Sequence, residues 1–97
     1  MPRDRADRYT PERLGPTGNA VKNNIRFLRL QRKMSVEEMA GRLDYLGWPA
    51  HPVVLYRIER GNRRVDVDEL ALFAKVFRVD AGDMLQPMKL PAMAAAS

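Results

Sequence analysis

The sequence predicts an all-α fold, a compact bundle of five short helices between two flexible tails. Three observations support this prediction. Apolar residues recur three or four positions apart in several segments, which is the spacing of one helix face. Two of those segments begin with a polar residue followed three positions later by glutamate, as capped helices do. No segment has a convincing strand pattern, because the β-prone run Val53–Leu55 is short and lies between helix signals.

Residues 1–18 mix both signs of charge with prolines and glycines and show no periodicity, so they are predicted to form a flexible basic tail. The helical pattern begins at about Asn19 and ends near Lys33, with basic residues on its outer face. Its inner face carries Val21, Ile25 and Leu28. A first amphipathic helix is therefore expected in this segment.

A second helix is predicted to follow Ser35. Ser35 and Glu38 have the spacing of a capping box, in which each side chain bonds the backbone N–H of the other residue. This helix ends at Gly47, and residues 48–51 form a turn. The third helix spans residues 52–60, and its first residue is a proline, which suits that position.

A fourth helix is expected after Asp66, because Asp66 and Glu69 repeat the capping pattern. Its apolar residues are Leu70, Leu72, Phe73, Val76 and Phe77. Asp80 is suited to cap a short fifth helix over residues 81–86. The Pro- and Ala-rich residues 87–97 are predicted to form a second flexible tail.

The composition is that of one soluble domain. A chain of 97 residues holds one modest core, and its 45% hydrophobic and 30% charged residues are typical of globular proteins. The absence of cysteine excludes disulfides and thiolate metal sites and fits a reducing cytoplasm. No apolar run approaches the roughly 20 residues that span a bilayer, and the N-terminus lacks a secretory signal. We therefore expect a cytoplasmic protein without membrane contact.

The charge is unevenly distributed. The formal net charge is +5 and the pI is about 10.1. Basic residues are concentrated in segments 19–34 and 52–64, whereas acidic residues are concentrated in segments 35–51 and 65–86. One cationic side of the molecule is therefore expected, as in proteins that bind nucleic acid. The alternative is that the arginines only keep the protein soluble.

Catalytic chemistry is not indicated. His51 is the only histidine and there is no cysteine, so no metal site is expected. The acidic pairs Glu37–Glu38 and Asp66–Asp68 are explained by helix starts, where the helix dipole favours negative charge. The glycines form no phosphate-binding fingerprint. We expect no enzyme activity, no cofactor and no small-molecule ligand.

Several stretches occur in an order and spacing typical of one family. They are Ile25 and Leu28 in the first helix, then Met34–Ala40, Tyr56–Gly61, Asp68–Ala74 and Val79–Leu85. Over residues 24–86 the chain resembles the Cro/lambda-repressor type of helix-turn-helix family, also called the XRE family. The run Arg63–Asp68 is similar to members from actinobacteria or their phages.

The resemblance implies that residues 19–86 form a DNA-binding domain whose third helix lies in the major groove. Leu55 and Ile58 would hold this helix to the core. The residues expected to face the bases are Val53, Val54, Tyr56 and Arg57. Arg57 is the preferred base reader because a guanidinium matches the O6/N7 edge of guanine. For the two valines, burial beside Leu55 is the alternative.

Phosphate contacts are expected around this helix. The residues are Ser35, His51, Arg60, Asn62, Arg63 and Arg64. Such contacts supply affinity and salt dependence rather than sequence choice. For Arg63 and Arg64 the alternative is a link to Asp66 or Asp68 at the next helix.

Two residues are expected to have structural roles. Glu59 is the one acid in a basic segment, and the resemblance implies an internal salt bridge to Arg26 or Arg29 of the first helix. Trp48 is expected to pack as a lid on the core with its N–H near the surface, rather than to stack on DNA.

The sequence also departs from the family in two ways. The family often has a phosphate-binding glutamine where this chain has Val36, so only backbone amides behind Ser35 remain for that contact. The distance from Ala40 to Tyr56 is about five residues longer than usual, which we attribute to an extra turn on the second helix and a longer connection.

The predicted function is sequence-specific binding of double-stranded DNA by a repressor-like transcriptional regulator on the bacterial nucleoid. A homodimer is expected on a two-fold site, through Met84 and Leu85 of the fifth helix. The tail residues Arg3, Arg5 and Arg8 are candidates for a minor-groove arm. Two rival functions stay open: a protein-interaction module, such as an antitoxin-like or adaptor bundle, and an RNA-binding bundle.

Overall fold

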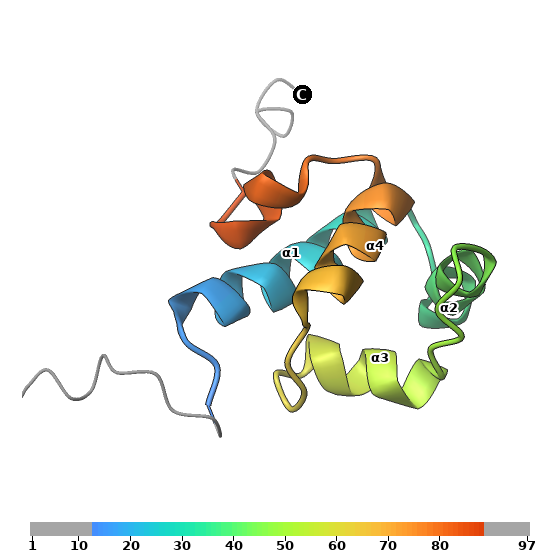
Figure 1. Ribbon diagram of the computed structural model, residues 1–97, viewed down its shortest axis with the longest axis horizontal. Coiled ribbons are helices and arrows are strands. Elements are labelled where there is room, and N and C mark those ends of the chain that lie inside the picture. The colour runs from blue at the N-terminus through green and yellow to red at the C-terminus, as the bar shows by residue number, and fades with distance from the viewer. Residues whose placement is uncertain (1–12, 89–97) are drawn as a thin grey trace, which may run out of the picture.

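The computed structural model describes residues 13–88, so the predicted arm residues Arg3, Arg5 and Arg8 lie outside the described residues. The described chain forms four α-helices and one 3-10 helix, with no strand in this range (Figure 1). They are α1 (Pro16–Gln31), α2 (Val36–Tyr45), α3 (Pro52–Glu59), α4 (Val67–Phe77) and the 3-10 helix η2 (Ala81–Leu85). The predicted all-α fold is confirmed. Within residues 13–88, no helix is both long and apolar enough to cross a membrane.

Helix α1 begins earlier than predicted, at Pro16 rather than at Asn19. Pro16 stands at the start of the helix, where its missing N–H loses no helical hydrogen bond. Gly18 lies inside the first turn beside Leu14, since a Cβ on Gly18 would come within 3.2 Å of the Leu14 side chain. The two residue types that indicated a flexible tail are therefore compatible with a helix at these positions.

The starts of α2 and α4 are as predicted. At α2 the hydroxyl of Ser35 accepts a hydrogen bond from the Glu38 N–H at 3.0 Å, and the Glu38 carboxylate accepts one from the Ser35 N–H at 2.8 Å. Asp66 and Glu69 make the same reciprocal pair at α4. The predicted side-chain cap at Asp80 is wrong, because η2 begins there without a side-chain hydrogen bond.

One core joins all five elements. Its fully buried large side chains are Phe73, Phe77, Ile25, Met39, Leu43, Leu55, Ile58 and Met84. Met84 is 0% exposed, so its predicted role in a dimer contact is wrong. The reason is that the single turn of η2 packs against both α1 and α4 and directs Met84 between them, whereas Leu85 stays exposed.

Asn24 of α1 holds the end of the described chain in place. Its side-chain amide donates to the carbonyl oxygens of Met84 and Gln86 at 3.0 and 2.9 Å, and its own oxygen accepts from the N–H of Met88. Met88 also packs against the core. The packed part of the chain therefore continues slightly beyond the predicted boundary at Gln86.

The longer connection between α2 and α3 is packed onto the domain. Gly47 has a positive φ of 105° and ends α2, as predicted. Trp48 follows half-buried, with its ring edge against Phe73 at a centroid distance of 5.7 Å and an interplanar angle of 87°. Trp48 therefore covers the core, as expected, and places the connection close to α4.

Candidate nucleic-acid interface

Helix α3 is built to expose one of its faces. Its start is fixed by Pro52 at the first position and by His51, whose Nδ1 accepts a hydrogen bond from the Val53 N–H at 3.0 Å. Leu55 and Ile58, three positions apart, are fully buried and hold the helix to the core. This arrangement determines which residues lie on the opposite face.

The four predicted base-reading residues differ in exposure. Val53 is 56% exposed and Tyr56 is 41% exposed, and Arg57 is also exposed. Val54 is half-buried and packs against the core. The alternative of burial therefore applies to Val54 but not to Val53, and three of the four side chains share the outer face.

The position of α3 leaves this outer face uncovered. Figure 1 shows α3 along the lower edge of the bundle, beside α2 and below α1 and α4. The buried Ala40 lies on α2, and the two helices pack directly together. Within the described range, α3 is therefore supported from one side by α1 and α2 and open to solvent on the other.

The carboxylate of Glu59 is bound by an arginine of α1, one of the two partners named from the sequence. Arg29 donates to it from Nε at 2.7 Å and from Nη2 at 2.9 Å, and a further N–H of Arg29 bonds the carbonyl oxygen of Met34. The side chains of Glu59 and Arg29 are only 5% and 10% exposed. The hydrogen bond with Glu59 raises the pKa of Arg29, although burial opposes this effect.

Arg26 is a more distant partner of the same carboxylate, at 3.7 Å, and its side chain is 59% exposed. Glu59 therefore faces the interior between cations, and its charge does not oppose an anionic ligand on the surface.

The basic surface of α1 meets the end of α3. Gly61, which follows α3 with φ of 84°, is so close to Lys22 that an added Cβ would come within 3.2 Å of the lysine Cε. Arg60 and Asn62 are exposed on the same connection, and Arg26 is exposed one turn along α1 from Lys22. Lys22 and Arg26 were not among the predicted contact residues, although the acid-free segment 19–34 contained the signal.

Arg63 has a partner that neither sequence alternative named. Its guanidinium forms two parallel hydrogen bonds with Glu69, at 2.6 and 2.9 Å, and the pairing raises the pKa of Arg63. Arg64 donates to the backbone carbonyl oxygen of Arg13, just before α1. Both side chains therefore link the connection after α3 to other parts of the domain.

The start of α2 offers less to a phosphate than the family pattern suggests. The Ser35 hydroxyl and the Ser35 and Glu38 amides are engaged in the capping box. Val36 is buried in the core, which explains why an apolar residue is tolerated where the family often has glutamine. His51 is exposed, and its Nδ1 is already engaged by the Val53 N–H.

These features define a DNA-binding helix-turn-helix fold: two packed helices, the second held by two buried residues and exposed along its outer face. Residues 25–84 match the family described as helix-turn-helix. The chain therefore belongs to the helix-turn-helix family of the Cro/lambda-repressor type, whose members are DNA-binding transcriptional regulators. Neither the curated proteins nor the solved structures gave a match to the chain.

Proposed function

We propose that this protein represses transcription by binding a specific double-stranded DNA sequence with α3 in the major groove. The observation that supports this most strongly is the division of α3 into a buried face and an exposed face. A helix that is held along one face and exposed along the other can enter the major groove and present its exposed side chains to the base edges. Glu59, the acid most harmful to such a contact, is turned inward onto Arg29.

Base contacts are assigned to three residues of the outer face. Arg57 is the proposed reader of guanine, since its two N–H groups match the O6 and N7 acceptors. Val53, near the start of the helix, suits the methyl group of thymine. Tyr56 lies on the same face and supplies a hydroxyl. Val54 is assigned to packing because it is half-buried.

Phosphate contacts are assigned to polar residues that surround α3. Those expected from the sequence are Ser35, His51, Arg60, Asn62 and Arg64. Arg64 stays in this group because it is a cation on the connection that follows α3. Lys22 and Arg26 of α1 join the group because they lie beside the end of α3. Arg63 leaves it, since its guanidinium is held by Glu69.

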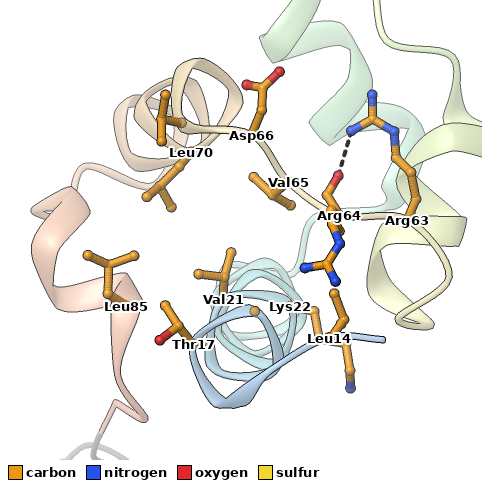
Figure 2. Close-up of a pocket in the computed structure, with 12 residues that line it drawn as sticks. Leu14, Thr17, Val21, Lys22, Arg63, Arg64, Val65, Asp66, Leu70 and Leu85 are labelled. Carbon is orange, nitrogen blue, oxygen red and sulfur yellow. Dashed lines mark hydrogen bonds between the residues drawn. The ribbon is translucent and has the colours of Figure 1, made fainter. Parts of the chain in front are cut away.

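A second copy of the chain is the proposed partner on DNA. A two-fold site presents identical half-sites about 34 Å apart and therefore recruits two identical subunits. We assign the contact to an apolar cavity of about 250 Å³ between η2, α1 and the start of α4. Figure 2 shows Val21, Leu70 and Leu85 pointing toward this space. Of the two residues predicted for the dimer, only Leu85 belongs to this surface.

The dimer contact is tested by Leu85→Arg. Binding to a two-fold duplex should weaken, whereas binding to an isolated half-site should not. Equal weakening on both duplexes would contradict the assignment.

The DNA-binding proposal is tested by selecting bound sequences from random duplexes and then comparing Arg57→Ala with Arg60→Ala. Arg57→Ala should relax the preference at one base pair and weaken binding by about 1–3 kcal/mol. Arg60→Ala should weaken binding to all sequences alike and reduce the slope of log K against log salt by about 0.9. A protein that prefers no duplex, or whose affinity does not fall with salt, would refute the proposal. Preference for RNA or for an acidic protein would instead support one of the rival functions.

A further inference from the structure

The side chain of Arg63 joins three segments of the domain. It belongs to the connection after α3, and it binds the Glu69 carboxylate at the start of α4 through two hydrogen bonds. One of its N–H groups also bonds the carbonyl oxygen of Arg64 at 2.9 Å (Figure 2). Its guanidinium lies over the ring of Trp48, 5.9 Å from the ring centroid. Trp48 belongs to the turn before α3, so this one side chain contacts both segments that flank α3.

These contacts matter because α3 is short. It has eight residues, too few for a helix to be stable without tertiary contacts. Leu55 and Ile58 fix which face of the helix is buried. They lie within one turn of each other, so they constrain the direction of the helix axis less than contacts at both ends would.

The Trp48–Arg63–Glu69 cluster supplies contacts at both ends. Glu69 is a rigid partner, since its side chain is 11% exposed and its Oε1 also accepts the N–H of Asp66 in the capping box. Trp48 is held by its edge contact with Phe73. Arg63 therefore connects the two flanking segments of α3 to α4, which belongs to the core.

We propose that Arg63 is a positioning residue for DNA reading: together with Glu69 and Trp48 it sets the direction in which α3 enters the major groove, and it does not bind phosphate. This inference rests on the proposed function. The geometry requires a planar group that donates two parallel hydrogen bonds to one carboxylate while it lies over a ring, and an ammonium cannot donate in this parallel arrangement. The positive charge of Arg63 is balanced by Glu69, so it adds little to the attraction of a phosphate backbone.

The test compares Arg63→Lys and Glu69→Gln with the control Arg42→Lys. Arg63→Lys keeps the charge but loses the planar pairing. Glu69→Gln preserves the capping function of this position and removes only the negative charge. Arg42 is exposed on α2 and is assigned no contact with DNA, so its replacement by lysine should change little. Affinity is measured for the selected duplex and for an unrelated duplex, at a temperature where circular dichroism shows every variant folded.

Both cluster variants should lower the ratio of specific to non-specific affinity by about tenfold, with an unchanged salt slope. A phosphate-binding role predicts the opposite for Glu69→Gln, because the released arginine would tighten binding to both duplexes. That result would overturn the proposal. So would a lower melting temperature with an unchanged affinity ratio, since it would mean that the cluster only stabilises the fold.

A measurement without DNA separates this inference from the proposed function. In amide hydrogen exchange, α3 should exchange at least about tenfold faster in Arg63→Lys and Glu69→Gln than in Arg42→Lys. If the parent protein binds no duplex, the proposed function fails while this exchange result still tests the positioning of α3. Unchanged exchange in α3 would overturn the positioning role, whatever the protein binds.

Discussion

Removing the charge of Glu59 should destabilise the domain far more than removing its exposed neighbour Arg26. Glu59→Gln leaves the buried Arg29 guanidinium without its anionic partner, to which it donates hydrogen bonds of 2.7 and 2.9 Å. Removing one member of a buried ion pair costs about 3–5 kcal/mol. We expect the lower part of this range, because glutamine keeps one acceptor and Arg29 keeps its bond to the Met34 carbonyl. Small domains have free energies of unfolding of about 5–15 kcal/mol, so this substitution should remove a large share of the stability.

The measurement is urea denaturation monitored by circular dichroism. The change in the free energy of unfolding is read from the shift of the denaturation midpoint, provided that the m-value is unchanged. The matched control is Arg26→Ala, which removes a cation from the same carboxylate at 3.7 Å and should cost less than about 1 kcal/mol. Pairing with Glu59 raises the pKa of Arg29. The stabilisation from this pair is therefore complete at pH values below the ordinary pKa of arginine, and it is lost only as the pH rises through the raised pKa. A cost for Glu59→Gln no greater than that of Arg26→Ala would refute the reasoning.

Three further predictions concern stability. Met84→Ala should lower the free energy of unfolding by about 2–5 kcal/mol because it leaves a cavity in the core, whereas Leu85→Ala should lower it by less than about 1 kcal/mol. Similar values for the two variants in thermal melts would mean that Met84 lies outside the core. Gly61→Ala should destabilise the domain by about 1 kcal/mol or more, because residue 61 has a positive φ. Gly41 lies in open space on α2, so Gly41→Ala should stabilise the domain by about 0.5–1 kcal/mol. Changes of the same sign for both variants in chemical denaturation would contradict this prediction. Ser35→Ala should cost about 0.5–2 kcal/mol through loss of the α2 cap, and an unchanged midpoint would argue against that cap.

Features set by neighbouring residues could be predicted from the sequence. The caps at Ser35 and Asp66 depend on residues three positions away, and both are present as expected. The division of α3 between Leu55 and Ile58 inside and Tyr56 outside follows from helical periodicity, which requires no knowledge of the partner helices. Local chemistry was therefore sufficient for most of the secondary structure and for identifying the exposed face of α3.

Features set by distant contacts could not be predicted in the same way. The carboxylate of Glu69 was predicted only as part of a cap. Both of its oxygens also accept hydrogen bonds from Arg63, and only the folded loop brings these two residues together. Met84 and Leu85 are adjacent and similarly apolar, so the sequence does not say which of them a single 3-10 turn directs inward. The contact of Lys22 with Gly61 likewise depends on how α1 crosses the end of α3.

The fold divides the arginines of the cationic side into two groups with different effects on binding. Arg29 and Arg63 are each paired with an acid that is largely buried, so each pair adds little net charge to the surface. Arg57 and Arg60 are exposed on and after α3 and keep their full charge toward solvent. Counterion release depends on the cations that meet phosphates, with a slope of about −0.9 per contact. The salt dependence of DNA binding should therefore follow the exposed group and be smaller than a count of arginines in the sequence suggests.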